Sequence, residues 1–519
     1  MKKILTTSLF VTTIILSGCG NSDDKKMNES NSQAPLSLLT YTPGENAIFA
    51  VASTVITGQK DAILVDAQFQ NQHAKEVVNL IKKSGKNLKY IYISHSDPDY
   101  YFGTNEILKA FPNAKVVSTA QTAYLIQASK DDKLAVWQPQ FPQGDAPEKI
   151  IIPEALNTGY LELDGQKIQV ESDPEDTAHS FLWIPSLKTA LGGISVSYDA
   201  HLWMADTNGV KGINLWTKQL DKILSLKPEQ VIPGHYIKSD FSPKPLDWIK
   251  GYLSNFKTAV TENKTSTEIV NFMKNKYPDL ADEDTLKMSA QVFTKEIDWK
   301  VASPYPAIGQ KIQVDFKNLK FDLDVKDHQN LIFTGAGGEV NADVSESVKY
   351  TPVEIAKNIF MVYWHEDKSG DNVVHVQDYN RDVVYTNIAE KTGNTIHLTG
   401  KISGVKGVIK DPELQQPLNK PFFAIGQTLL VNVAGQTQRL QFVGQKNLNI
   451  INGQNTSTTV EYSAIQVGPD QFMVYWNDAV NKRNVVVVLD QKANLIYQNV
   501  ATFDGKFSNS KGEFETQSK

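Results

Sequence analysis

The sequence predicts a multidomain protein of the α+β/β class, in which a layered α/β unit precedes two tandem antiparallel β-domains. Its length of 519 residues corresponds to several folding units at about 150 residues per domain. Helical and strand patterns alternate over residues 36–244, which is typical of an α/β unit. Near the C-terminus a motif recurs after 112 residues, which indicates an internal repeat.

The composition is that of an ordinary globular chain, with 41% hydrophobic and 21% charged residues. This excludes disordered, collagen-like and low-complexity classes. The formal net charge is −6 and no long basic run is present, so we expect no nucleic-acid partner. The chain has one cysteine, Cys19, which excludes an internal disulfide and a thiolate metal cluster.

The N-terminus has the pattern of an export signal. Two lysines precede an apolar stretch over Ile4–Leu16, and small residues follow it. The closing Leu-Ser-Gly-Cys, residues 16–19, resembles the bacterial lipobox, which implies that Cys19 becomes the diacylated first residue, with palmitate as an acyl group. Gly20 after it, by the same resemblance, favours the outer membrane of a double-membraned bacterium, facing periplasm or exterior. A buried free thiol is the structural alternative for Cys19.

The sequence divides into five segments: a signal peptide (1–18), the lipidated cysteine with a polar tether (19–35), the α/β unit with C-terminal helices (36–300), and two β-domains (301–410 and 417–515). Within the α/β unit we expect the following elements in order: a strand over 61–66, a helix over 73–83 stopped by Gly85, a buried strand over 88–94, a hairpin of 181–185 with 189–191, a helix over 215–226, and helices throughout 245–299. Trp248, Leu253 and Phe256 are the expected core of the last helices.

The repeat defines the two β-domains. The segment Phe360–Trp364 recurs as Phe472–Trp476, and further matches follow without a gap, up to Gly393 with Gly505. Each copy alternates Val, Tyr, Phe and Thr with polar residues, which predicts a small antiparallel barrel or sandwich. The aromatic core and the following valine-rich strand resemble the MoaF-like family, which implies lipocalin-like barrels. Trp364 and Trp476 are then either barrel core or the lining of a ligand cavity.

The residues with the chemistry of a site follow the buried strand. His95, Asp97, Asp99 and Tyr100 come directly after it, and His235 lies near the end of the unit. This order resembles the metallo-β-lactamase superfamily, whose HxHxDH motif follows a strand. The resemblance implies an αββα fold and a divalent-metal hydrolase, because bound metal brings the pKa of water toward 7 and polarises the scissile bond.

Several positions depart from that motif. Asp97 replaces the second histidine, Tyr100 replaces the third, and Gly192-Gly193 replaces the usual Gly-Asp that bridges two metals. The loop ligand is either His179 or Asp173. We therefore expect no intact dinuclear zinc site.

Three interpretations remain open. In the first, His95, Asp97, Asp99, His235 and either His179 or Asp173 hold a single metal, zinc first and iron or manganese as alternatives. Asp99 and Tyr100 would then be catalytic, in a hydrolase of a small ester, lactone or amide. In the second, the site is degenerate, holds no metal and binds a small ligand or a partner together with the lipocalin-like domains. In the third, the histidines are structural.

His201 and Trp203 are candidate ligand-binding residues that would line the pocket. His201 matches a histidine found in lipoprotein-like hydrolases of this superfamily. The structural alternative is a histidine that packs beside apolar neighbours.

Overall fold

The structure is a computed structural model that describes residues 35–207, 209–297, 299, 301–408, 410–452 and 456–517. The predicted signal peptide and the lipidation site Cys19 lie outside the described residues. Within the described part of the chain, no helix combines the length and apolar character that a membrane crossing needs.

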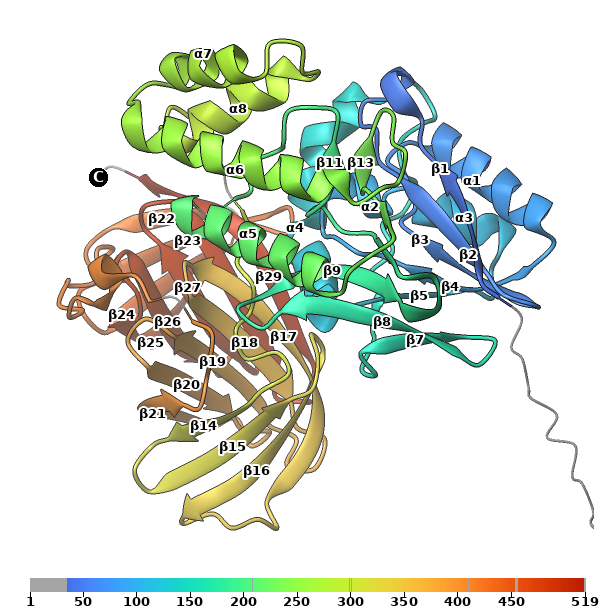
Figure 1. The fold of residues 1–519 in the computed structure, drawn as a ribbon. Coiled ribbons are helices and arrows are strands. Elements are labelled where there is room, and N and C mark those ends of the chain that lie inside the picture. The colour runs from blue at the N-terminus through green and yellow to red at the C-terminus, as the bar shows by residue number, and fades with distance from the viewer. Residues whose placement is uncertain are drawn as a thin grey trace, which may run out of the picture.

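The N-terminal unit contains two stacked sheets (Figure 1). Its first sheet has six strands in sequence order, antiparallel from β1 to β3 and parallel from β3 to β6. Those strands are β1 (Ser37–Tyr41), β2 (Ser53–Thr57), β3 (Asp61–Val65), β4 (Asn87–Tyr92), β5 (Lys115–Ser118) and β6 (Glu154–Ala155). The second sheet has the order β12-β10-β9-β8-β7, and β11 pairs with β13 beside it. Those strands are β7 (Tyr160–Leu163), β8 (Gln166–Asp173), β9 (Asp176–Ile184), β10 (Thr189–Leu191), β11 (Ser197–Tyr198), β12 (Gln230–Ile232) and β13 (His235–Tyr236).

The helices of this unit pack on the outer faces of the two sheets or on one another. They are α1 (Asn71–Ser84), α2 (Pro98–Tyr101), α3 (Thr104–Ala110), α4 (Ala120–Trp137), α5 (Gly209–Ser225), α6 (Lys244–Glu262), α7 (Ser266–Lys276) and α8 (Glu283–Phe293). Short 3-10 helices are η1 (Gly44–Asn46), η2 (Gln138–Gln140), η3 (Pro185–Leu187) and η4 (Pro412–Gln415).

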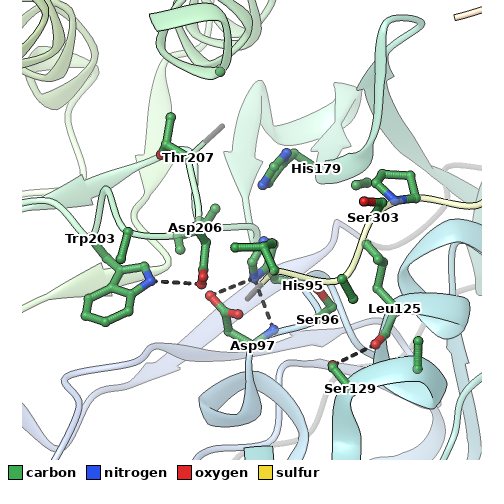
Figure 2. Close-up of a pocket in the computed structure, with 18 of the residues that line it drawn as sticks. His95, Ser96, Asp97, Leu125, Ser129, His179, Trp203, Asp206, Thr207 and Ser303 are labelled. Atoms are coloured by element: carbon green, nitrogen blue, oxygen red, sulfur yellow. Dashed lines mark hydrogen bonds and ion pairs between the residues drawn. The ribbon is translucent and has the colours of Figure 1, made fainter. Parts of the chain in front are cut away.

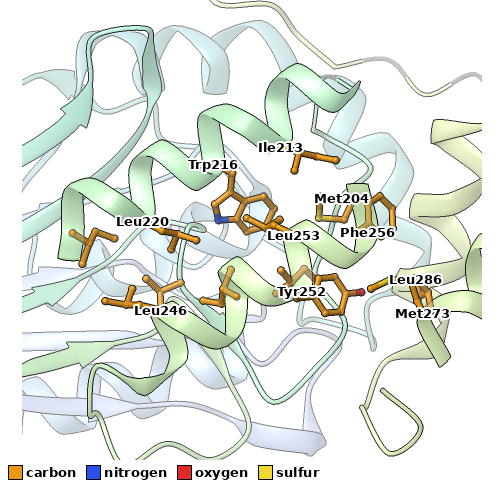
Figure 3. Packing of buried hydrophobic residues seen from close by; sticks show 14 of the residues in the cluster. Met204, Ile213, Trp216, Leu220, Leu246, Tyr252, Leu253, Phe256, Met273 and Leu286 are labelled. Atoms are coloured by element: carbon orange, nitrogen blue, oxygen red, sulfur yellow. The ribbon is translucent and has the colours of Figure 1, made fainter. Parts of the chain in front are cut away.

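Three apolar clusters make the layers of this unit. One lies between the two sheets and includes Ile63 of β3 and Leu182 of β9. A second joins the first sheet to α1, because Val77 and Ile81 stand one turn apart on the same face of that helix. The third joins the second sheet to α5–α8 (Figure 3). The layers are thus helix, sheet, sheet, helix.

The expected elements are present with small differences at their ends. The helix expected over 215–226 begins at Gly209, because the buried Ile213 extends its apolar face toward the N-terminus. The strand expected over 88–94 ends at Tyr92, so Ser94 already belongs to the loop. Leu253 and Phe256 are fully buried, and Trp248 packs against their cluster.

The C-terminal part consists of two closed antiparallel barrels, which confirms the predicted fold class. The first barrel contains β14 (Lys311–Asp315), β15 (Leu319–Val325), β16 (Asn330–Gly338), β17 (Ser345–Ala356), β18 (Ile359–His365), β19 (Asn372–Asp378), β20 (Val383–Ala389) and β21 (Thr395–Ser403). The second contains β22 (Thr428–Val433), β23 (Gln436–Val443), β24 (Asn447–Asn452), β25 (Thr456–Gln466), β26 (Gln471–Asp478), β27 (Arg483–Asp490), β28 (Leu495–Thr502) and β29 (Phe507–Gln517). Trp364 and Trp476 are 4% and 5% exposed and pack with the buried residues of their own barrel.

The two barrels pack through equivalent faces. One apolar cluster contains residues of both barrels that are related by the repeat, such as Met361 with Met473 and Val374 with Val486. Their strands, β18 and β19 on one side and β26 and β27 on the other, occupy the same places in the two barrels. The arrangement therefore resembles a two-fold dimer within one chain.

The first barrel also packs on the N-terminal unit. Tyr124 and Leu125 of α4 belong to the same apolar cluster as the interior of this barrel. Tyr305, just before the barrel, is 1% exposed, and its hydroxyl donates to Gln377 Oε1 at 2.7 Å. Gln121 of α4 donates in turn to the Tyr305 carbonyl at 3.1 Å. Tyr305 thus closes the barrel and attaches it to α4.

Candidate functional site

The candidate site lies at the edge of the stacked sheets, in one part of a cavity of about 3000 Å³ that residues of both barrels, such as Glu354 and Tyr497, also line. One loop and two strands bring its titratable residues together. The loop after β4 carries His95 and Asp97, and Pro98 at the first position of α2 ends that loop. β9 carries His179 near its start, and β13 begins with His235. Figure 2 shows several of these side chains around the cavity.

Three histidines and one tyrosine form a chain of ring contacts. The rings of His95 and His179 are stacked with centroids 5.1 Å apart. The Tyr100 ring stands between His95 and His235, with centroid distances of 5.2 Å and 5.5 Å. The structure therefore brings four of the predicted site residues into mutual contact. The Tyr100 hydroxyl is buried and has no hydrogen-bond partner among the described residues.

Three carboxylates of the cluster are each paired with a basic side chain. Asp99 Oδ2 lies 2.8 Å from His235 Nε2. Asp97 Oδ1 lies 2.7 Å from the Lys133 ammonium, and its Oδ2 lies 3.4 Å from His95 Nδ1. Both carboxylate oxygens of Asp176 lie 2.8 Å from His179 Nδ1.

These pairs control the protonation of the site. Burial lowers the pKa of His235, but the charge of Asp99 and its hydrogen bond outweigh burial and hold that pKa above its usual value. Burial also lowers the pKa of His179, and Asp176 reverses that shift in the same way. For Asp97, burial raises the pKa, but Lys133 and His95 outweigh it and hold the pKa well below its usual range.

A buried network below the site fixes the loop after β4. Asp66 accepts hydrogen bonds from the backbone N–H and the hydroxyl of Ser94, at 2.8 and 2.7 Å. Burial raises the pKa of the Asp66 carboxyl to about 7, although these two hydrogen bonds act in the opposite direction. The Ser94 hydroxyl accepts from the Gly193 N–H at 2.7 Å. The network therefore connects β3, β4 and the loop after β10.

Gly193 occupies the position where the motif has a bridging aspartate. Its φ of +76° is unfavourable for other residues, and an added Cβ would lie 2.2 Å from the Ser180 carbonyl oxygen. Gly234, before His235, approaches the same loop, because its Cβ would lie 2.1 Å from the Gly193 oxygen. The backbone here leaves no room for an aspartate at position 193.

The structure distinguishes the two candidate loop ligands. Asp173 and Asp176 pair across a two-residue hairpin turn between β8 and β9. Asp173 accepts a hydrogen bond from the Glu175 N–H at 2.8 Å and does not line the cavity. His179, in contrast, stacks on His95. The hairpin therefore places His179 in the cluster and Asp173 outside it.

The two candidate ligand-binding residues lie in the wall of the cavity. His201 Nδ1 lies 2.9 Å from the Tyr252 hydroxyl of α6, and the side chain is buried against that helix. Burial lowers the pKa of His201. Trp203 donates its indole N–H to Asp206 at 2.8 Å. His201 thus serves the packing of α6, whereas Trp203 belongs to the cavity wall near the cluster.

Sequence reasoning missed Lys133, Asp176, Asp206 and Trp299. Asp206 accepts hydrogen bonds from the indoles of Trp203 and Trp299, at 2.8 and 2.6 Å. Lys133 is on α4, far from the motif in sequence. Asp176 precedes His179 by three residues, and that spacing could have suggested a carboxylate–histidine pair. No sequence motif points to Lys133, Asp206 or Trp299 as a site residue.

The donor set does not fit the dinuclear metal centre of the motif. Among the described residues, no group of three or more His, Cys, Asp or Glu side chains is arranged to hold a metal ion. The carboxylates at 97, 99 and 176 are instead paired with Lys133 and the histidines. The bridging position is a glycine without space for a side chain.

Comparison with known proteins identifies the class of each part. Residues 47–235 match the sequence model of the metallo-beta-lactamase superfamily, and residues 308–403 and 425–515 match that of the MoaF-like family. The protein therefore joins a metallo-beta-lactamase superfamily domain to two MoaF-like domains, and both predicted resemblances are confirmed. That superfamily is hydrolase-like and usually binds divalent metals.

Individual relatives are distant. The "Uncharacterized protein YobT" of Bacillus subtilis (strain 168) is 28% identical over 123 residues, which are 23% of this chain and 50% of that protein. The chain thus spans about half the length of this curated relative.

Similar solved structures include the metallo-beta-lactamase family protein TTHA1429 from Thermus thermophilus (15% identity, TM-score 0.37). The match covers 50% of this chain and 93% of that protein. For a metallo-beta-lactamase from Pontibacter korlensis, the match covers 42% of this chain and 93% of that protein (17% identity, TM-score 0.31). For the sec-alkylsulfatase Pisa1 from Pseudomonas sp., the match covers 48% of this chain and 47% of that protein (13% identity, TM-score 0.33).

Proposed function

We propose that this protein is an envelope-anchored hydrolase of a small ester, lactone or amide, which acts at the histidine cluster of its metallo-beta-lactamase superfamily domain. The observation that carries the proposal is the pair of carboxylate–histidine dyads at one cavity. Asp99 of α2 pairs with His235 of β13, and Asp176 pairs with His179 within β9. Ring contacts through His95 and Tyr100 connect the two histidines.

The dyads supply general-base chemistry. A histidine whose one nitrogen donates to a carboxylate keeps a basic second nitrogen, and the carboxylate stabilises the imidazolium that forms. With Nε2 of His235 bonded to Asp99, its Nδ1 can take a proton from an attacking water molecule.

A bound metal is a separate prediction of the sequence motif. That prediction is zinc, with iron or manganese as alternatives, held by His95, Asp97, Asp99, His235 and either His179 or Asp173. Because Asp97 and Asp99 are paired with Lys133 and His235, the proposed hydrolysis assigns no step to a metal. The hydrolytic chemistry described above uses only side chains of this chain. Elemental analysis of the purified protein, before and after chelation, measures the metal content.

The hydrolase is tested with the form that lacks residues 1–19, assayed against a panel of esters, lactones and amides. We expect His235→Asn to lower kcat/KM by roughly 100-fold, because general-base catalysis contributes about that much. His73→Asn is the matched control, since His73 is on α1 and bonds Tyr41 outside the cluster. Turnover that His235→Asn and His179→Asn both leave intact would refute the dyads as bases. Ligand binding without turnover would support the binding-protein alternative.

The anchor is tested by Cys19→Ser. We expect this variant to leave the membrane fraction, because the removal of the acylated residue takes away the stable attachment that two acyl chains give. Unchanged membrane association, measured by fractionation and immunoblotting, would contradict the lipoprotein assignment.

A further inference from the structure

Lys133 is a cation built into the candidate site by an element outside the motif. It lies on α4, and its ammonium donates to Asp97 Oδ1 at 2.7 Å and to the Ser96 carbonyl at 2.9 Å. Both contacts are with the loop that follows β4. The side chains of Lys133 and Asp97 are only 26% and 13% exposed. The lysine therefore holds the loop that carries His95 and Asp97.

The acidic residues around this ammonium need a counter-charge. Asp97 lies against it, and the charges of Asp97, Asp206 and Asp99 raise the pKa of Lys133 against the effect of burial. Asp206 is also engaged by the indoles of Trp203 and Trp299. Carboxylates this close together repel one another unless a cation neutralises them. In a metal-loaded centre a divalent ion supplies that charge.

We propose that the Lys133 ammonium is the resident cation of this site and neutralises Asp97 in the place of a divalent metal ion. Three departures from the motif agree with this assignment. Position 97 has a carboxylate, which an ammonium can bond, where the motif has a neutral metal-binding histidine. Position 193 has no space for the bridging aspartate. Lys133 itself reaches the loop from a helix on which the motif places no ligand.

The proposal does not depend on hydrolysis. It concerns how the charge of the site is balanced, and its readouts are thermal stability and metal content. A failure to find a substrate would leave it intact, and a failure of the proposal would leave the two dyads available for catalysis.

The test compares wild type with Lys133→Met in excess chelator and in excess zinc, with the form that lacks residues 1–19. For wild type we expect the same Tm under both conditions and less than a stoichiometric amount of bound zinc. For Lys133→Met in chelator we expect a Tm lower by about 3–6 °C, because the largely buried Asp97 carboxylate loses its ammonium partner and keeps only the longer contact with His95. Zinc should restore part of this loss, since an ion that binds only the folded state stabilises it.

Two further variants make the result specific. Lys130→Met removes a lysine from the same helix whose partner Asp131 is 81% exposed, so it should change neither Tm nor zinc content. In the double variant Lys133→Met with Asp97→Asn the uncompensated charge is gone, so the Tm in chelator should recover without zinc. Wild-type protein that retains one zinc per chain and loses stability in chelator would overturn the proposal. A Lys133→Met variant with unchanged Tm and unchanged zinc uptake would overturn it as well.

Discussion

At the scale of single residues, Asp66 shows how a carboxylate outside the cavity can control the site. Its side chain is buried, and both of its oxygens accept hydrogen bonds from Ser94, the residue before His95. The loop that carries His95 and Asp97 is therefore held from below by Asp66 and from the side by Lys133. Such contacts fix the position of functional groups without touching a substrate.

The raised pKa of Asp66 predicts a pH-dependent stability. The folded state holds the Asp66 proton up to about pH 7, whereas the unfolded chain releases it near its ordinary value of 3.8. Between these values the folded state binds more protons, so the contribution of this group to stability falls as the pH rises. Asp66→Asn removes the titrating carboxyl and with it this pH-dependent contribution to stability. We expect the free energy of unfolding of the variant, relative to wild type, to rise by roughly 2–3 kcal/mol between pH 5 and 8.

The measurement is denaturant unfolding at several pH values. Asp131→Asn is the control, because its 81% exposed carboxylate should give a nearly constant difference across the same range. A pH-independent difference for Asp66→Asn would mean that Asp66 is ionised in the folded protein at pH 5.

At the scale of elements, local patterns predicted the fold well. The hairpin of β9 and β10, the helix α1 with its stop at Gly85 and the three helices after residue 244 follow from periodicity and breaker residues. The barrels were recognisable because each strand pattern occurs twice, once in each copy of the repeat. The ends of elements were less accurate, as with α5, because tertiary burial of Ile213 extends a helix beyond its clearest pattern.

The site was predictable only where its residues belong to the motif. His95, Asp99 and His235 were found through order and spacing, and the structure brings them to one cavity. The choice between His179 and Asp173 depended on a hairpin turn that spacing alone did not locate. Lys133 could not be found, because an ordinary lysine on a helix has no sequence signature that distinguishes it from a solvated one.

At the scale of the whole molecule, Tyr305 connects the domains. We predict that a fragment that starts at Ala302 folds alone and gives an almost purely β circular dichroism spectrum, since each barrel has its own apolar core. A fragment that starts at Ile308 lacks Tyr305 and should unfold at a Tm lower by roughly 10 °C, because removal of a buried aromatic side chain costs about 3–5 kcal/mol. Equal Tm values for the two fragments would show that Tyr305 contributes only to domain attachment. A helix-rich or unfolded spectrum of the longer fragment would contradict its independent folding.

The pairing of the two barrels through equivalent faces has a consequence for assembly. Two separate barrels with this self-complementary face would associate in proportion to their concentration and would separate on dilution. In this chain the segment between β21 and β22 joins them, so their association is intramolecular and does not depend on the concentration of the protein. The apolar face shared by Met361 and Met473 therefore stays covered however few copies of the protein a cell contains.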